Sequence, residues 1–182
     1  VYHCRMFYGN GTARDVRNSP WRDKGLGVIP DLASHMLDLV LFWFGRPAGA
    51  PQVWTVQKHE NAAFDYFLMG FPDSLPVVKL EGTLLAWRNT FGLDLIGERG
   101  SLHVTGLCKW GPTSLVLRDR VLPSGKPAED VVTLEQQDPT WALEYDYFRD
   151  LCRRGGSNID NDIWINGVLN GLGRMLGVEM LA

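Results

Sequence analysis

The order of apolar patterns along the chain predicts an α+β domain with a sizeable, largely antiparallel sheet. One strand-like and one helix-like segment open the chain. Seven short strand-like runs follow between residues 52 and 134, and two helix-like segments close it. Because the strands are grouped and do not alternate with helices, a doubly wound nucleotide-binding fold is not predicted.

The first 45 residues divide into a strand, a loop and a helix. Residues 1–9 are rich in aromatic and β-favouring types and end at the turn signal GNGT. Residues 13–27 are polar and interrupted by proline and glycine, so we expect a surface loop there. Pro30 suits a first helical turn and Gly45 is a stop signal, which predicts a helix over residues 30–44.

The remaining elements follow from turn residues and periodicity. Gly, Pro, Asp and Asn separate the seven strand-like runs. Asp138 is a residue type that caps helices, and apolar residues then recur at helical spacing until Gly155. A last amphipathic helix is predicted over residues 161–180. No GxGxxG loop follows a strand, so this chain is not expected to bind a dinucleotide by itself.

The composition is that of a single globular domain, with 182 residues, 45% hydrophobic and 21% charged. The net charge of −3 gives no basic footprint, which argues against a nucleic-acid partner. The longest apolar run is too short to span a membrane, so no membrane partner is expected. Cys4, Cys108 and Cys152 suggest neither a disulfide framework nor a zinc site and fit a reducing cytoplasm.

Three polar residues interrupt the apolar run of the first helix. Asp31, His35 and Asp38 are spaced to fall on one helix face, with His35 in the middle. Carboxylates beside an imidazole fix its orientation and raise its proton affinity, which suits a general acid/base. Such a histidine could take a proton from a hydroxyl while hydride leaves the same carbon for a cofactor.

For the three residues together, a structural role is about as well supported by the sequence as a catalytic one. A lone histidine in an apolar helix is more often a satisfied core residue, and Asp31 could serve only as a cap. A metal site is the weaker interpretation, because no second cluster of His, Asp or Glu supplies further ligands.

Several segments together resemble a known family. GVIPDLASHMLDLVLFWFG follows the pattern of a glycine-rich loop, then D-x-x-x-H-x-x-D, then apolar residues. It is similar to the helix that opens the C-terminal domain of the glucose-fructose oxidoreductase, inositol 2-dehydrogenase and rhizopine-catabolism (Gfo/Idh/MocA) family. NSPWRDK, LIGERGSLHV and DPTWALEYDYFRDL resemble that domain in order and spacing, so the similarity spans nearly the whole chain.

The resemblance implies a fold and an assembly. The family domain is an open, mainly antiparallel sheet with helices packed on one face, also described as dihydrodipicolinate-reductase-like. Its free sheet face often forms the oligomer interface, which implies a homodimer or homotetramer. The family's N-terminal Rossmann domain, with a phosphate-binding glycine loop and an E-K-P segment, has no counterpart in this sequence. We therefore expect residues 1–182 to be one substrate-binding and oligomerisation domain that is inactive alone.

The resemblance also implies site residues. Asp31 and His35 would be the catalytic pair, with His35 near the substrate carbinol, whereas Asp38 looks structural. Trp21, Arg22 and Lys24, in the loop before the helix, are candidates for substrate binding. The cofactor would be NAD or NADP, bound mainly by the missing domain, and the substrate a sugar, polyol or related hydroxy compound. The alternative is a non-catalytic oligomerisation or binding module in which Asp31, His35 and Asp38 are only structural.

Overall fold

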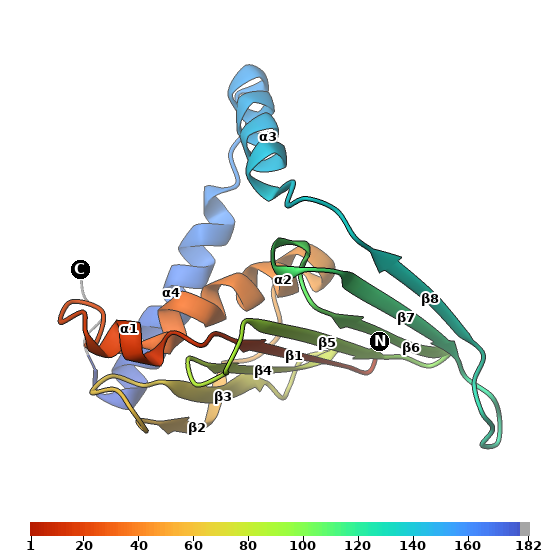
Figure 1. Cartoon of the computed structure of the whole chain (residues 1–182), viewed down its shortest axis with the longest axis horizontal. Helices are drawn as coiled ribbons and strands as arrows, with labels where there is room; N and C mark the ends of the chain where they lie inside the picture. The colour runs from red at the N-terminus through yellow and green to blue at the C-terminus, as the bar shows by residue number, and fades with distance from the viewer. Residues whose placement is uncertain (179–182) are drawn as a thin grey trace.

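The computed structural model describes residues 1–178 and contains one eight-stranded sheet with helices over one face (Figure 1). The strands are β1 (His3–Gly9), β2 (Gln52–Gln57), β3 (Tyr66–Phe71), β4 (Val77–Thr83), β5 (Thr90–Ile96), β6 (Gly100–Thr105), β7 (Thr113–Asp119) and β8 (Glu129–Leu134). The helices are α1 (Ala13–Arg17), α2 (Ser34–Phe44), α3 (Thr140–Arg154) and α4 (Ile159–Leu176), with short helical turns η1 (Ile29–Ala33) and η2 (Cys108–Trp110). The predicted α+β class with an open, largely antiparallel sheet is confirmed.

The first strand lies in the middle of the sheet. The strand order is β2-β3-β4-β1-β5-β6-β7-β8. β1 pairs parallel with β4 and antiparallel with β5, and the other neighbours pair antiparallel. Each strand-like run of the sequence has become a strand. The C-terminal end of β1 therefore lies between the end of β4 and the start of β5, where these three strands terminate on the same side.

The predicted surface loop over residues 13–27 is wrong at its start. Ala13 and Val16 are buried on α1, and their backbone forms a short helix. Two small apolar residues three apart lie on one helix face, which is enough to anchor a single turn on the core. The polar residues around them hide this pattern in the sequence.

The helix predicted over residues 30–44 has the expected extent but not a uniform geometry. Its first turn, η1, is π-helical, and regular α2 begins only at Ser34. A π-helical turn is wider than an α-helical one because its hydrogen bonds run from i to i+5. Gly45 ends the helix with φ of 72° and donates its backbone N–H to the Leu41 carbonyl, as its stop signal predicts.

The two C-terminal helices begin and end near their predicted bounds. Asp138 Oδ1 accepts hydrogen bonds from the backbone N–H of Thr140 at 3.0 Å and from its hydroxyl at 2.7 Å, which starts α3. The last helix begins at Ile159, two residues before its predicted start, and Gly177 follows it with φ of 66°. Residues 179 and 180, predicted as its end, lie outside the described residues. No helix within residues 1–178 is long and apolar enough to cross a membrane.

The core lies between the sheet and the helices over it. Alternate residues of β1 point into it, so Cys4 and Met6 are fully buried whereas Arg5 between them is exposed. Met36 and Leu172 meet this layer from α2 and α4, and neither is exposed to solvent. α1, α2 and α4 lie on the same side of the sheet in Figure 1, which confirms the helices on one face.

Helix α3 stands away from this core (Figure 1). None of its residues is buried. Large apolar side chains on it are strongly exposed, including Trp141 at 78%, Leu143 at 62% and Phe148 at 60%. Exposed apolar surface of this extent is typical of an interaction site.

Candidate functional site

A cavity of about 640 Å³ opens beside the start of the long helix. The loop before that helix contributes Trp21, Arg22 and Lys24, the three residues predicted to bind substrate, and η1 contributes Asp31. Val16, Leu26, Pro30 and Leu84 add apolar lining, and Gly25 and Gly27 complete the wall. The structure therefore brings four of the five predicted site residues to one cavity, and it does not place His35 in the lining.

Gly27 fixes how the loop enters the helix. Its φ is 56°, in the left-handed region. A Cβ at this position would lie 2.1 Å from the Phe64 carbonyl oxygen, so the two backbones approach closer than any side chain allows. The N–H of Val28 donates to the same carbonyl at 2.8 Å. This close contact holds the loop against the rest of the fold and sets the position of the cavity wall.

Arg22 and Asp31 form an ion pair across the cavity. Arg22 Nη2 lies 3.8 Å from Asp31 Oδ2, and their side chains are 36% and 44% exposed. The guanidinium also lies 6.0 Å from the centre of the Trp21 ring. A pair this exposed stabilises the fold by less than about 1 kcal/mol because water screens it. Both charges therefore remain available to a polar ligand at small energetic cost.

Asp31, His35 and Asp38 are all exposed, which corrects their interpretation as polar residues inside an apolar run. The apolar residues around them, such as Met36 and Leu37, recur at helical spacing and point into the core. The three polar residues occupy the opposite stripe of the same helix and so face away from the sheet. Because these three side chains are solvated, they do not need a hydrogen-bond or ion-pair partner within the protein.

The predicted orientation of His35 by a carboxylate is not observed. Within residues 1–178, no hydrogen bond or ion pair joins His35 to Asp31 or Asp38. Asp31 lies in the wider η1 turn and is paired with Arg22, so the spacing of four residues does not produce the stacking of a regular α-helix. The aromatic neighbour of His35 is Tyr8, with ring centres 6.1 Å apart.

A second group of side chains, not found from the sequence, adjoins His35. Tyr8 is the next-to-last residue of β1 and is only 6% exposed. Its hydroxyl accepts a hydrogen bond of 3.2 Å from Lys109 Nζ, and its ring packs edge-on against Trp110 at 5.5 Å. Lys109 and Trp110 belong to η2, between β6 and β7. The alternation of β1 could have placed Tyr8 toward the helices, but no local pattern connects it to η2.

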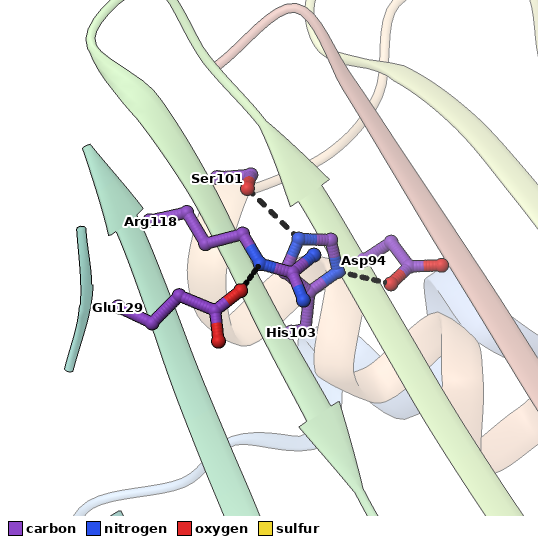
Figure 2. Close-up of polar contacts among 5 residues, drawn as sticks. All are labelled: Asp94, Ser101, His103, Arg118 and Glu129. Carbon is purple, nitrogen blue, oxygen red and sulfur yellow. Dashed lines mark hydrogen bonds and ion pairs between the residues drawn. The ribbon is translucent and has the colours of Figure 1, made fainter. Parts of the chain in front are cut away.

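The outer sheet face carries a separate chain of polar contacts (Figure 2). His103 Nδ1 lies 2.6 Å from Asp94 Oδ1, and His103 Nε2 lies 2.8 Å from Ser101 Oγ. Arg118 and Glu129 form a nearby ion pair at 2.8 Å. Asp94 and His103 are directly opposite one another on paired strands, as expected of a cross-strand pair. The surrounding backbone amides belong to sheet ladders, so no oxyanion-binding donors accompany this Ser-His-Asp arrangement.

Across residues 1–178, no three His, Cys, Asp or Glu side chains lie together as ligands for a metal ion.

Solved structures share this fold. A protein from Desulfitobacterium hafniense that is named a putative NADPH-dependent oxidoreductase matches 97% of this chain with a TM-score of 0.75 and 15% identity. UDP-N-acetylglucosamine 3-dehydrogenase GnnA from Acidithiobacillus ferrooxidans matches 93%, with a TM-score of 0.64 and 13% identity. The 3-ketoreductase KijD10 from Actinomadura kijaniata, solved with TDP-benzene and NADP, matches 92%, with a TM-score of 0.59 and 10% identity.

These matches establish the fold and its extent. The chain covers 55%, 53% and 49% of the three neighbouring chains, respectively, and so spans about half their length. No family model and no curated protein matches the sequence. The neighbours are oxidoreductases of the Gfo/Idh/MocA type, so the fold implied by that resemblance is confirmed.

Proposed function

We propose that this chain is the C-terminal catalytic and substrate-binding domain of an NAD(P)-dependent oxidoreductase. Its substrate would be a sugar, polyol or related hydroxy compound. The observation that carries the proposal is the cavity lined by Trp21, Arg22, Lys24 and Asp31 at the start of the helix that presents His35. The names of neighbours with this fold support the reaction class, since they include a sugar-nucleotide dehydrogenase and a ketoreductase solved with NADP.

His35 would perform the proton transfer. Its imidazole is exposed and makes no hydrogen bond to a protein group within residues 1–178, so a substrate hydroxyl can reach it. An imidazole nitrogen can accept the hydroxyl proton in oxidation and return it in reduction. Asp31 would act through the ion pair with Arg22, which holds both groups at the cavity. Arg22 and Lys24 would donate hydrogen bonds to substrate hydroxyls, and Trp21 would cover an apolar face of the sugar.

The described residues do not form a dinucleotide cradle. The glycines after β1 lead into α1, which has only five residues, and no GxGxxG loop is present. We therefore propose that a second, N-terminal domain binds most of NAD or NADP. The bound nicotinamide would exchange hydride with the substrate carbon, while this chain binds and orients the substrate and moves the hydroxyl proton.

The exposed apolar surface of helix α3 supports the proposal that a second domain packs against it. Its exposed Trp141, Leu143 and Phe148 would be covered in the complete protein. Alone, residues 1–182 would then lack both the cofactor site and the cover for this helix, and we propose that they are inactive. Three unpaired cysteines, one of them buried, support a cytoplasmic location.

The free sheet face would join subunits into a homodimer or homotetramer. All six residues of β8 are exposed, and Val131, on the same free face as His103, is 58% exposed. The same exposure favours the second candidate function, a non-catalytic oligomerisation module. A turnover assay distinguishes the two candidate functions, because only the catalytic one requires His35.

The test is His35→Ala in the complete protein, assayed with a panel of sugars and polyols and both nicotinamide cofactors. Loss of turnover with retained assembly supports the catalytic proposal. Unchanged turnover rejects the catalytic proposal and favours the non-catalytic oligomerisation module.

A further inference from the structure

Lys109 joins two distant segments beside the proposed site. Its ammonium donates a 3.2 Å hydrogen bond to the hydroxyl of Tyr8, a residue 101 positions earlier in the chain. The same ammonium lies 4.7 Å from the centre of the Trp110 ring. The contact is made where the end of β1 meets the loop between β6 and β7. A lysine is thus held over two aromatic rings at the same end of the strands as the proposed site.

Tyr8 adjoins both this lysine and His35. The Tyr8 and His35 rings have centres 6.1 Å apart and are tilted by 39°. Tyr8 is nearly buried, so its ring is fixed between the helix and the loop. A sugar whose reacting hydroxyl lies at His35 would therefore present its neighbouring substituents to Tyr8 and Lys109.

The ammonium has no carboxylate partner within ion-pair distance in residues 1–178. Its charge acts on Asp138. The pKa of Asp138 is lowered mainly by hydrogen bonds from Thr140 and to a smaller extent by the charge of Lys109. Asp138 is thus engaged with the start of α3. An amine held beside aromatic rings without a paired anion leaves a positive charge for a ligand to neutralise.

Two donors converge at this position. Tyr8 accepts the hydrogen bond from Lys109, so its own O–H remains to donate, and no acceptor for it is found in the described part of the chain. The ammonium has further N–H groups of its own. Adjacent donors from a phenol and an ammonium match two oxygens of one carboxylate or phosphate.

We propose that Lys109 and Tyr8 bind an acidic group of the substrate, so that the enzyme acts on a sugar acid or a sugar phosphate. The inference rests on the proposed oxidoreductase function, since it assigns the substrate class of the same site. Both acid types share the required chemistry, an anionic oxygen pair next to a hydroxylated chain. Trp110 supplies an apolar surface beside it.

The test measures binding without turnover in the complete protein. D-glucuronate, D-glucose 6-phosphate and neutral D-glucose are titrated by calorimetry against the wild type, Lys109→Met and Tyr8→Phe. Lys126→Met is the matched control, because Lys126 is an exposed lysine in the loop before β8. Comparing the two acids shows which anion the site accepts.

We expect at least one acid to bind more tightly than D-glucose, and Lys109→Met to weaken it about 10-fold to 100-fold. Tyr8→Phe, which keeps the ring, should weaken it less, and Lys126→Met should leave it unchanged. No saturable binding of either acid, or unchanged affinity in Lys109→Met, overturns the inference. Failure of His35→Ala to reduce turnover rejects the proposed function instead, and this binding readout does not depend on turnover.

Discussion

Arg22 Nη2 lies 3.8 Å from Asp31 Oδ2, joining the loop before the helix to the first turn of that helix. The pair faces the cavity and is partly exposed, so its role in folding is small. Its position between Trp21 and the helix that carries His35 suggests a role in ordering the substrate.

Replacing Arg22 by alanine should affect binding more than folding. The free energy of unfolding should fall by less than about 1 kcal/mol because the ion pair is exposed. In the complete protein KM should rise by about 10-fold, as expected for the loss of one charged hydrogen bond. Arg118→Ala is the matched control, since Arg118 also forms a partly exposed pair, with Glu129, but on the outer sheet face. Equal effects of both changes on KM would remove Arg22 from the site.

Gly27→Ala should destabilise the protein strongly. The new Cβ would lie 2.1 Å from the Phe64 carbonyl oxygen, and the backbone φ of 56° is already unfavourable for alanine. Gly45→Ala is a matched control with φ of 72° and open space around its Cβ. Chemical denaturation should show a loss above about 2 kcal/mol at Gly27 and a loss of about 1 kcal/mol at Gly45. Similar losses at both positions would mean that the close backbone contact is unimportant.

The Cys4 thiol should make stability fall at alkaline pH. Burial, with a smaller contribution from Asp94, raises the pKa of Cys4 from 9.0 to about 12. Between these values the folded state keeps the thiol proton that the unfolded state has lost, so stability decreases as pH rises through this range. Wild type and Cys4→Ala should therefore converge in unfolding free energy from pH 9 toward pH 12. Parallel curves would show that the thiol ionises equally in both states.

The assembly proposal predicts that a charge on β8 disrupts association. Val131→Asp places a carboxylate at a 58% exposed position of the edge strand, on the same free sheet face as His103. Light scattering should show smaller particles for this variant, because an unpaired charge is costly to bury in an interface. Leu75→Asp, at an 82% exposed position between β3 and β4, should leave the mass unchanged. An unaltered mass for Val131→Asp would place the interface elsewhere.

Local sequence patterns were sufficient for most of the fold. Turn residues separated the strands from one another, and Gly45 marked the helix end correctly because a positive φ is a local property. The loop residues Trp21, Arg22 and Lys24 reach the cavity together with Asp31, as their closeness in sequence suggested.

The rest depended on tertiary structure. The contact between Tyr8 and Lys109 spans 101 positions and arises only from the strand order. The π-helical turn that separates Asp31 from His35 has no clear local signal. Regular α-helical spacing therefore predicted a hydrogen-bonded pair that the structure does not contain.

The central claim is that His35 transfers the substrate proton, and the most direct measurement is the pH dependence of kcat/KM for wild type, His35→Gln and Asp38→Ala in the complete protein. We expect His35→Gln to lose at least about 100-fold in kcat/KM, together with the pH dependence that the wild type shows. Asp38→Ala, on the same exposed helix face, should retain the wild-type rate and profile. A His35→Gln enzyme with the wild-type rate and pH profile would contradict the claim.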